Sequence, residues 1–95
     1  MSEITVIRED GPTGGRYLTT IEGHAAEMTY SKAGAARLII DHTSVPDALR
    51  GKGAGQALVK RAVEDARAAG IKIIPLCPFA KAQIEKHAEW QDVLA

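Results

Sequence analysis

The stretch HTSVPDALRGKGAGQALVKRAVEDARAAG, residues 42–70, decides how this chain folds. Its middle part, RGKGAG (residues 50–55), places three glycines and two cations directly before a pattern of helical period. The first backbone N–H groups of a helix have no partner inside the helix, and the helix dipole adds partial positive charge there. Glycines let an anion approach this backbone without a side chain in the way. The stretch is therefore suited to hold a phosphate at the start of a helix.

Taken alone, the glycines leave two interpretations open, a ligand site or a flexible loop before a helix. The P-loop pattern G-x-x-x-x-G-K-[ST] is absent from the chain. The dinucleotide-binding pattern G-x-G-x-x-G is incomplete, because Gln56 stands where the third glycine would be. The residues around the glycines have to decide between the two interpretations.

Downstream of the glycines the apolar residues follow helical spacing, which predicts a helix over residues 53–69 with Gly70 as its stop. IKIIPL (residues 71–76) predicts a short buried strand. The remainder, residues 78–95, predicts a second helix with Pro78 in its first turn.

Upstream of residue 42 the pattern predicts strands separated by short turns. The predicted strands are residues 3–9, 16–22, 25–31 and 35–45. Short loops favour an antiparallel meander, and the strand–helix–strand unit that follows makes the last strand parallel to its partner. We therefore predict an α+β fold of order β-β-β-β-α-β-α, a mixed sheet with two helices.

Composition limits the kinds of function. A length of 95 residues predicts a single domain over residues 1–95. Lys plus Arg equals Asp plus Glu, 12 against 12, so there is no overall basic field and no nucleic-acid partner is expected. One cysteine, no signal-peptide pattern and no long apolar run predict a cytoplasmic protein that does not enter membranes. The histidines and the cysteine have no metal-ligand spacing, so no metal is expected.

The wider sequence context makes the glycine stretch more specific. Arg50 to Gly55 fit R/Q-x-x-G-x-G/A, between an apolar strand and a helix followed by a further strand. This arrangement resembles the pyrophosphate-binding motif of the GNAT N-acetyltransferase superfamily. IDHTSVPDALRGKGAGQALV followed by GIKIIPLCPFAKAQIEKH is similar to the small single-domain GNAT-like acetyltransferases of the YidJ type. The resemblance covers roughly residues 17–93. It implies a minimal GNAT fold, with two parallel strands that splay to form a coenzyme A cleft.

The resemblance implies acetyl-CoA as cofactor and an amine, on a small molecule or a protein, as acceptor. The pantetheine arm is expected along residues 42–45, the pyrophosphate on the amides of residues 51–55, and residues 74–77 as the second wall. The cofactor contacts that it implies are Thr43, Ser44, Val45, Arg50, Gly51, Lys52, Gly53, Ala54, Gly55, Gln56, Pro75, Leu76, Pro78, Phe79 and Lys81. The chain lacks the helices that follow the first strand in larger GNAT enzymes and the terminal strands that close their acceptor side. It also lacks a tyrosine in LCPFAK, where many GNAT enzymes place their acid.

Two residues are candidates for catalysis. Cys77 is expected near the thioester, where its thiol could accept the acetyl group or protonate the departing thiolate. The alternative is a small buried hydrophobic residue. His42 is expected at the mouth of the cleft, as a base for the incoming amine or as a strand cap bonded to backbone.

Three functions therefore stay open. The first is a GNAT-type N-acetyltransferase, expected as a monomer or weak dimer. The second is a non-catalytic module that binds coenzyme A. The third is a binder of another phosphate or nucleotide.

Overall fold

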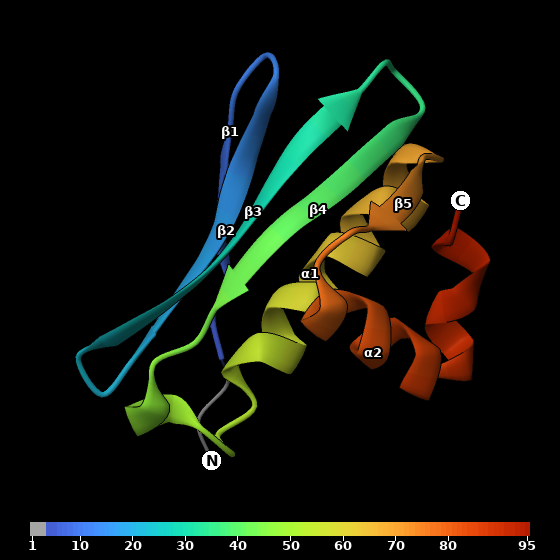
Figure 1. Ribbon diagram of the computed structural model, residues 1–95. Helices are drawn as coiled ribbons and strands as arrows, with labels where there is room; N and C mark the ends of the chain where they lie inside the picture. Colours follow the sequence, from blue (N-terminus) through green and yellow to red (C-terminus); the bar gives the residue numbers. More distant parts are fainter. Residues whose placement is uncertain (1–3) are drawn as a thin grey trace.

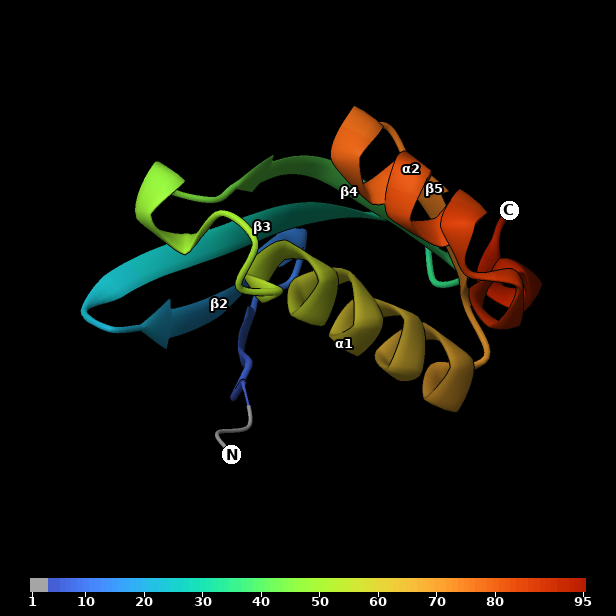
Figure 2. The same cartoon turned by 90° about the horizontal axis from the view of Figure 1, so that it is seen from below.

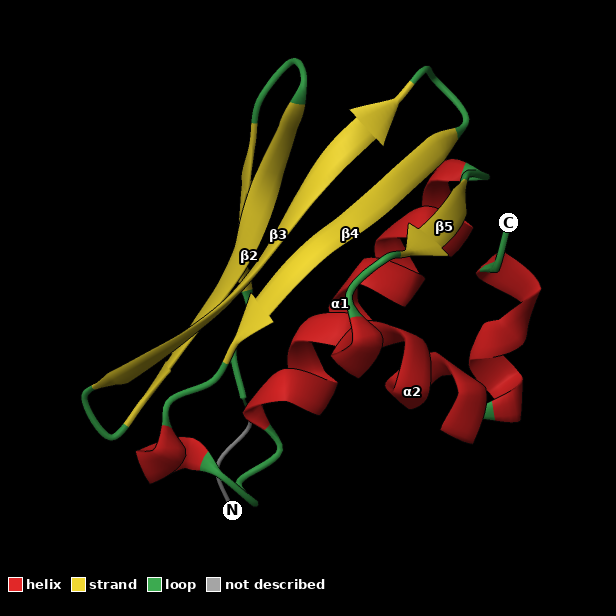
Figure 3. Cartoon of the chain, in the orientation of Figure 1, coloured by secondary structure: helices red, strands yellow, loops and turns green. Residues whose placement is uncertain are grey.

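The computed structural model describes residues 4–95, which form one five-stranded sheet with helices packed against it (Figures 1 and 3). The elements are β1 (Ile7–Asp10), β2 (Gly14–Ile21), β3 (His24–Ala33), β4 (Arg37–Ser44), η1 (Asp47–Leu49), α1 (Ala54–Ala69), β5 (Lys72–Pro75), α2 (Pro78–Lys86) and η2 (Ala88–Val93). Strands β1 to β4 pair antiparallel in chain order, and β5 pairs parallel with β4. The predicted α+β fold and its order β-β-β-β-α-β-α are confirmed.

The hairpin between β2 and β3 has the turn that a tight two-residue connection requires. Glu22 and Gly23 both have positive φ, 52° and 80°, and Ile21 pairs directly with His24. This is the type I′ geometry, whose twist matches that of the flanking strands. Because the turn is this short, the register of the hairpin is fixed. Tyr17 and Met28 then lie opposite each other and are fully buried.

The strand β4 contains a bulge that changes which side chains face the helices. Tyr30 of β3 pairs with Ile40, but its neighbour Thr29 pairs with His42, so Asp41 is an extra residue in β4. A bulge shifts the alternation of the side chains that follow it. Thr43, which pairs with Met28, therefore lies on the side of the sheet that α1 covers.

We call this side the α1 face; it carries Tyr17, Met28 and Ile40. The opposite side, which carries Arg16, Thr29 and His42, is called the open face. In Figure 2, α1 runs below the curved sheet. Its buried residues are Ala54, Gly55, Leu58, Val59, Ala62, Val63 and Ala66, which recur at the spacing of one helical face. Gly70 ends α1 in the left-handed conformation, as its position in the sequence predicts.

The prediction of one helix over residues 78–95 is wrong. α2 ends at Lys86, and His87 adopts an extended conformation with φ −113° and ψ 97° before η2 begins. The ring of His87 stacks on Trp90, with the ring centroids 3.9 Å apart, and this contact holds the break in the helix. After η2 the chain turns back to the sheet, where Leu94 pairs with Ile73 and the Ala95 N–H donates to the Ile73 carbonyl over 3.0 Å.

The first predicted strand, residues 3–9, is also shifted. β1 begins at Ile7, and residue 3 lies outside the described residues. Gly14 and Gly15, which the sequence assigns to a turn, begin β2 instead. Within residues 4–95, no helix has the length and apolar character that crossing a bilayer requires.

Candidate active site

The glycine loop forms the start of α1 in the way that an anion site requires. Gly51 and Gly53 have φ values of 79° and 81°, in the left-handed region that side chains with a Cβ rarely adopt. Gly53 precedes the first helical residue, and no side chain caps this end of the helix. The amides of Ala54, Gly55 and Gln56 thus have no partner inside the helix. Because no acidic residue lies in the first turn, the positive end of the helix dipole is not neutralised there.

Gly55 serves a purpose that the sequence does not reveal. A Cβ built on Gly55 would lie 2.4 Å from a ring carbon of Phe79, the second residue of α2. The third glycine of the motif is therefore needed for packing of the Phe79 ring against α1. Only Gly51 and Gly53 are required by the backbone conformation of the loop.

A pocket of about 540 Å³ opens between the glycine loop, the end of β4 and α2. Its lining consists of Thr43, Val45, Leu49, Arg50, Gly51, Gly53, Ala54, Gly55, Gln56, Phe79 and Gln83. Leu49 and Gln83 were not predicted from the sequence. Gln83 could have been found from helical spacing, since it follows Phe79 by four residues and so shares its face of α2. Leu49 lies in η1, a short element that the sequence analysis did not predict.

The other predicted cofactor contacts lie outside this lining. They are Ser44, Lys52, Pro75, Leu76, Pro78 and Lys81. Lys52 forms an ion pair with Glu22 at the tip of the β2–β3 hairpin, with 3.1 Å between Nζ and Oε1. Arg50 does reach the pocket, and its guanidinium forms an exposed ion pair with Asp47 at 3.0 Å. Exposed pairs are weak, so an anion in the pocket can compete for Arg50.

A histidine from the break after α2 contacts the pocket residue Gln56. His87 Nδ1 lies 2.7 Å from the carbonyl oxygen of Gln83, so Nδ1 carries the proton and donates it. In the neutral ring, Nε2 is then an acceptor, and it lies 3.3 Å from the Gln56 amide nitrogen. The arrangement fixes the side chain of Gln56 at the first turn of α1. The sequence analysis did not predict this contact.

Cys77 lies directly before α2 and is 5% exposed. Its Sγ lies 3.4 Å from Thr43 Oγ1, and its backbone N–H donates to the carbonyl of Ile40 over 3.1 Å. Burial raises the pKa of the Cys77 thiol, but its hydrogen bond with the Thr43 hydroxyl and the proximity of the backbone amides of Ala80 and Phe79 lower that pKa by more. The pKa therefore lies below the ordinary value. Cys77 adjoins the pocket through Thr43 and does not itself line it.

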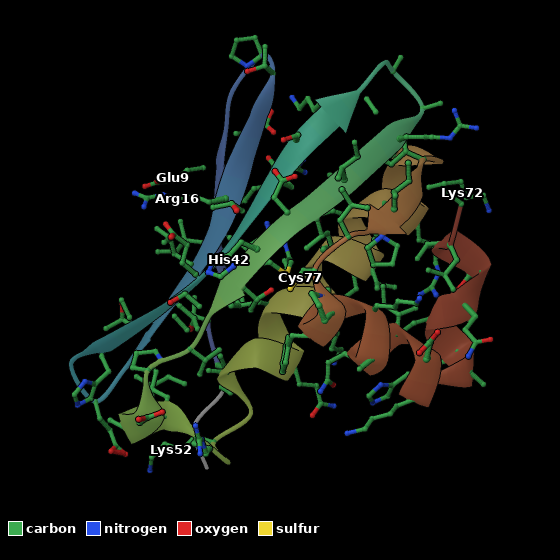
Figure 4. All side chains as sticks on the ribbon, in the orientation of Figure 1. Glu9, Arg16, His42, Lys52, Lys72 and Cys77 are labelled. Atoms are coloured by element: carbon green, nitrogen blue, oxygen red, sulfur yellow. The ribbon has the colours of Figure 1, made fainter. Side chains whose placement is uncertain are left out.

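The structure does not bring His42 and Cys77 together on one face of the sheet. Because of the bulge at Asp41, the exposed His42 lies on the open face, whereas Thr43 and Cys77 meet on the α1 face. Figure 4 shows His42 on β4 and Cys77 at the start of α2. Asp41, the bulged residue, accepts a hydrogen bond from Ser31 over 2.6 Å.

Comparison with known proteins agrees with this geometry. The family model of the GCN5-related N-acetyltransferases matches residues 16–93. The chain belongs to this family. The solution structure of a GCN5-like candidate N-acetyltransferase from Staphylococcus aureus aligns with a TM-score of 0.73 and 38% sequence identity, over 100% of this chain and 91% of that one. No curated protein gives a significant match. The narrower assignment to the YidJ type stays a prediction.

Membership of the GCN5-related family makes the protein an acyltransferase of the acetyltransferase class, and acetyl-CoA is the typical cofactor of that family. The pocket fits such a group on its own chemistry. Free helix amides and Arg50 suit a pyrophosphate. Pairing between β4 and β5 ends at Ile40 and Pro75, so the following β4 residues have no β5 partner on that edge. An amide-containing arm could pair there as an added strand would.

Proposed function

We propose that the protein transfers an acetyl group from acetyl-CoA to an amine, with acetyl-CoA bound in the pocket at the start of α1. The observation that carries this proposal is the uncapped, acid-free first turn of α1, which opens on a pocket beside the unpaired edge of β4. The amides of Ala54, Gly55 and Gln56 and the side chain of Arg50 would hold the pyrophosphate. Acetyl-CoA would supply an acetyl group already activated as a thioester.

In this proposal Cys77 and His42 act from opposite sides of the sheet. Cys77 would hold or release a proton at Sγ, or accept the acetyl group there, and its lowered pKa supports either role. His42 is exposed on the open face, so an amine could approach from the side of the sheet opposite to the proposed acetyl-CoA pocket. A neutral imidazole there can remove a proton from an incoming ammonium group.

Calorimetric titration with acetyl-CoA and, separately, with ATP tests the binding step. We expect acetyl-CoA to bind and Arg50→Ala to weaken it several-fold, since one exposed cation contributes about 1 kcal/mol. Binding of ATP without binding of acetyl-CoA would remove the proposed cofactor and favour another phosphate ligand.

Acetyl transfer to a panel of amines tests the chemical step. We expect Cys77→Ala to bind acetyl-CoA normally and to lose most of the transfer activity. His42→Ala should lose activity above all near neutral pH, where an imidazole is mostly neutral and the amine is still protonated. His24→Ala, at the exposed start of β3, is the matched control and should behave as the unaltered protein. Undiminished transfer by Cys77→Ala would exclude Cys77 from the mechanism.

One observation favours a second candidate, a module that binds coenzyme A without catalysis. Cys77 is 5% exposed and does not line the pocket, so it could be a buried structural residue. Intact mass after incubation with acetyl-CoA separates the candidates when it is combined with the amine panel. Binding with neither an acetyl adduct nor turnover would support the module, and turnover would exclude it.

A further inference from the structure

The side chain of Thr43 occupies a special position between the pocket and Cys77. Register with the buried Met28 turns Thr43 toward the α1 face, next to the end of β4. Thr43 lines the pocket, while its Oγ1 lies 3.4 Å from the Cys77 sulfur. Without the bulge at Asp41, strand alternation would turn His42 to this face in its place. The bulge therefore sets a hydroxyl, and not an imidazole, against the thiol.

Cys77 is held at this point by several contacts at once. Its N–H is bonded to the Ile40 carbonyl, which fixes its backbone on β4. Its carbonyl accepts the N–H of Lys81 over 3.0 Å, and it stands directly before α2, whose start no side chain caps by a hydrogen bond. Its Sγ contacts the Thr43 hydroxyl, so Cys77 is held both from β4 and from α2.

We propose that Thr43 is a positioning residue for Cys77, whose hydroxyl holds the sulfur beside the pocket and stabilises its ionised form. In the thiol form, Sγ–H donates to Oγ1. When the thiol loses its proton, the hydroxyl rotates and donates its own hydrogen to the sulfur. The hydrogen bond between Sγ and Oγ1 is then kept, with donor and acceptor exchanged. A hydroxyl can partner both forms in this way, whereas an isosteric valine can partner neither.

Charged groups around Cys77 do not offer a competing explanation. On β4, Asp41 and His42 belong to the open face, on the far side of the sheet. On α2, the nearest charged residue is the exposed Lys81. From α1, the buried residues are all apolar or glycine, and the partly buried Arg61 and Asp65 form an ion pair with each other. The Thr43 hydroxyl is therefore the side-chain group that contacts the thiol.

The test measures the rate of alkylation of the free full-length chain by iodoacetamide between pH 5 and 10, followed by intact mass. Cys77 is the single cysteine, so each adduct reports on it. The thiolate attacks carbon, a sulfur–carbon bond forms and iodide leaves.

The pH midpoint of the alkylation rate is the readout, because it does not depend on how easily the reagent reaches the Cys77 sulfur. We expect Thr43→Val to raise the midpoint by about one pH unit, the equivalent of one hydrogen bond. Thr43→Ser should restore it.

Two controls make the result decisive. Thr20→Val, on the exposed part of β2, should leave the midpoint unchanged. In denaturant all variants should share one midpoint, which shows that the shift belongs to the folded protein. If circular dichroism shows that Thr43→Val does not fold, Thr43→Ala removes the same hydroxyl without added bulk. Midpoints of Thr43→Val or Thr43→Ala that coincide with the unaltered protein would overturn the proposal.

The catalytic meaning of Thr43 rests on the proposed function, but this measurement needs no acetyl-CoA. A shifted midpoint in a protein that transfers no acetyl group would leave the Thr43–Cys77 pair intact and refute the proposed function. If the unaltered protein transfers the acetyl group but the midpoint does not shift in Thr43→Val, the proposed function stands and the positioning role of Thr43 is refuted.

Discussion

The first turn of α1 leaves its backbone donors free, whereas the opposite half of the same helix is surrounded by side chains that pair with one another. There, Asp65 accepts hydrogen bonds from the buried Tyr17 hydroxyl at 2.9 Å and from Arg8 at 3.3 Å, and Arg61 forms an ion pair with it at 3.2 Å. Arg8 also donates to the Tyr30 hydroxyl over 2.9 Å. We call these five residues the Asp65 network.

The Asp65 network is closed: across residues 4–95, every buried polar side-chain atom has a hydrogen-bond partner. Burial, followed by the hydrogen bond to Asp65, raises the pKa of Tyr17 well above its ordinary value, so Tyr17 stays a neutral donor. The comparison separates two uses of polar groups between a helix and a sheet. Paired groups stabilise the fold, and unpaired groups at a helix start are available to a ligand.

The largest expected effect on stability comes from removing the central acceptor of the Asp65 network. Asp65→Ala should lower the free energy of unfolding by roughly 3 kcal/mol, because the buried Tyr17 hydroxyl and two arginines lose their acceptor. Urea denaturation measures this. Glu64→Ala, an exposed neighbour on α1, is the control and should change stability by less than about 0.5 kcal/mol. Adding Tyr17→Phe to Asp65→Ala should cost little more. A loss equal to that of Glu64→Ala would show that the network is not stabilising.

A smaller effect is expected from adding a side chain at Gly55, in the first turn of α1, where the Phe79 ring leaves no space for it. Gly55→Ala places a methyl group against the Phe79 ring and should cost roughly 1–2 kcal/mol of stability while narrowing the pocket. Thermal unfolding and acetyl-CoA titration measure the two consequences. Adding Phe79→Ala should recover stability, because the contact that causes the strain is then gone. If the double variant were no more stable than Gly55→Ala, the assignment of Gly55 to Phe79 packing would be wrong.

The smallest effect concerns the loss of stability at acid pH, which involves Asp10, a neighbour of the Asp65 network. Hydrogen bonds from the Tyr30 hydroxyl and from Lys32 hold the pKa of Asp10 below its ordinary value. The stabilisation from Asp10 is then complete above its unfolded pKa, about 3.9, and is lost as the pH falls through its lower folded pKa. Urea denaturation between pH 7 and pH 3 should show a decline below about pH 4 that is shallower in Asp10→Asn. Equal declines in both proteins would contradict the prediction.

The sequence predicted the parts of the molecule that depend on local pattern. Alternation located β2 and most of β3, and helical spacing with Gly70 located α1 almost to the residue. The glycine motif and the strand before it also contribute most of the pocket lining. These features follow from the conformational preferences of nearby residues.

What the sequence did not predict depends on contacts between distant residues. Alternation from Leu38 and Ile40 would place His42 on the α1 face, and the bulge at Asp41 reverses this without any glycine or proline to mark it. The pairing of Thr43 with Cys77 joins segments that only the parallel packing of β5 brings together. The end of α2 at Lys86 depends on the His87 ring packing against Trp90, which helical propensity does not encode.

The pairing of Leu94 and Ala95 with Ile73 also bears on how the protein behaves at high concentration. β5 is an outer strand of four residues, and outer strands offer backbone groups that can recruit a second chain and start aggregation. The segment after η2 occupies part of that border and uses the Ile73 carbonyl itself. The C-terminal segment thus protects part of the β5 edge from pairing with a strand of another chain. Changes to Leu94 or Ala95 therefore put solubility, rather than catalysis, at risk.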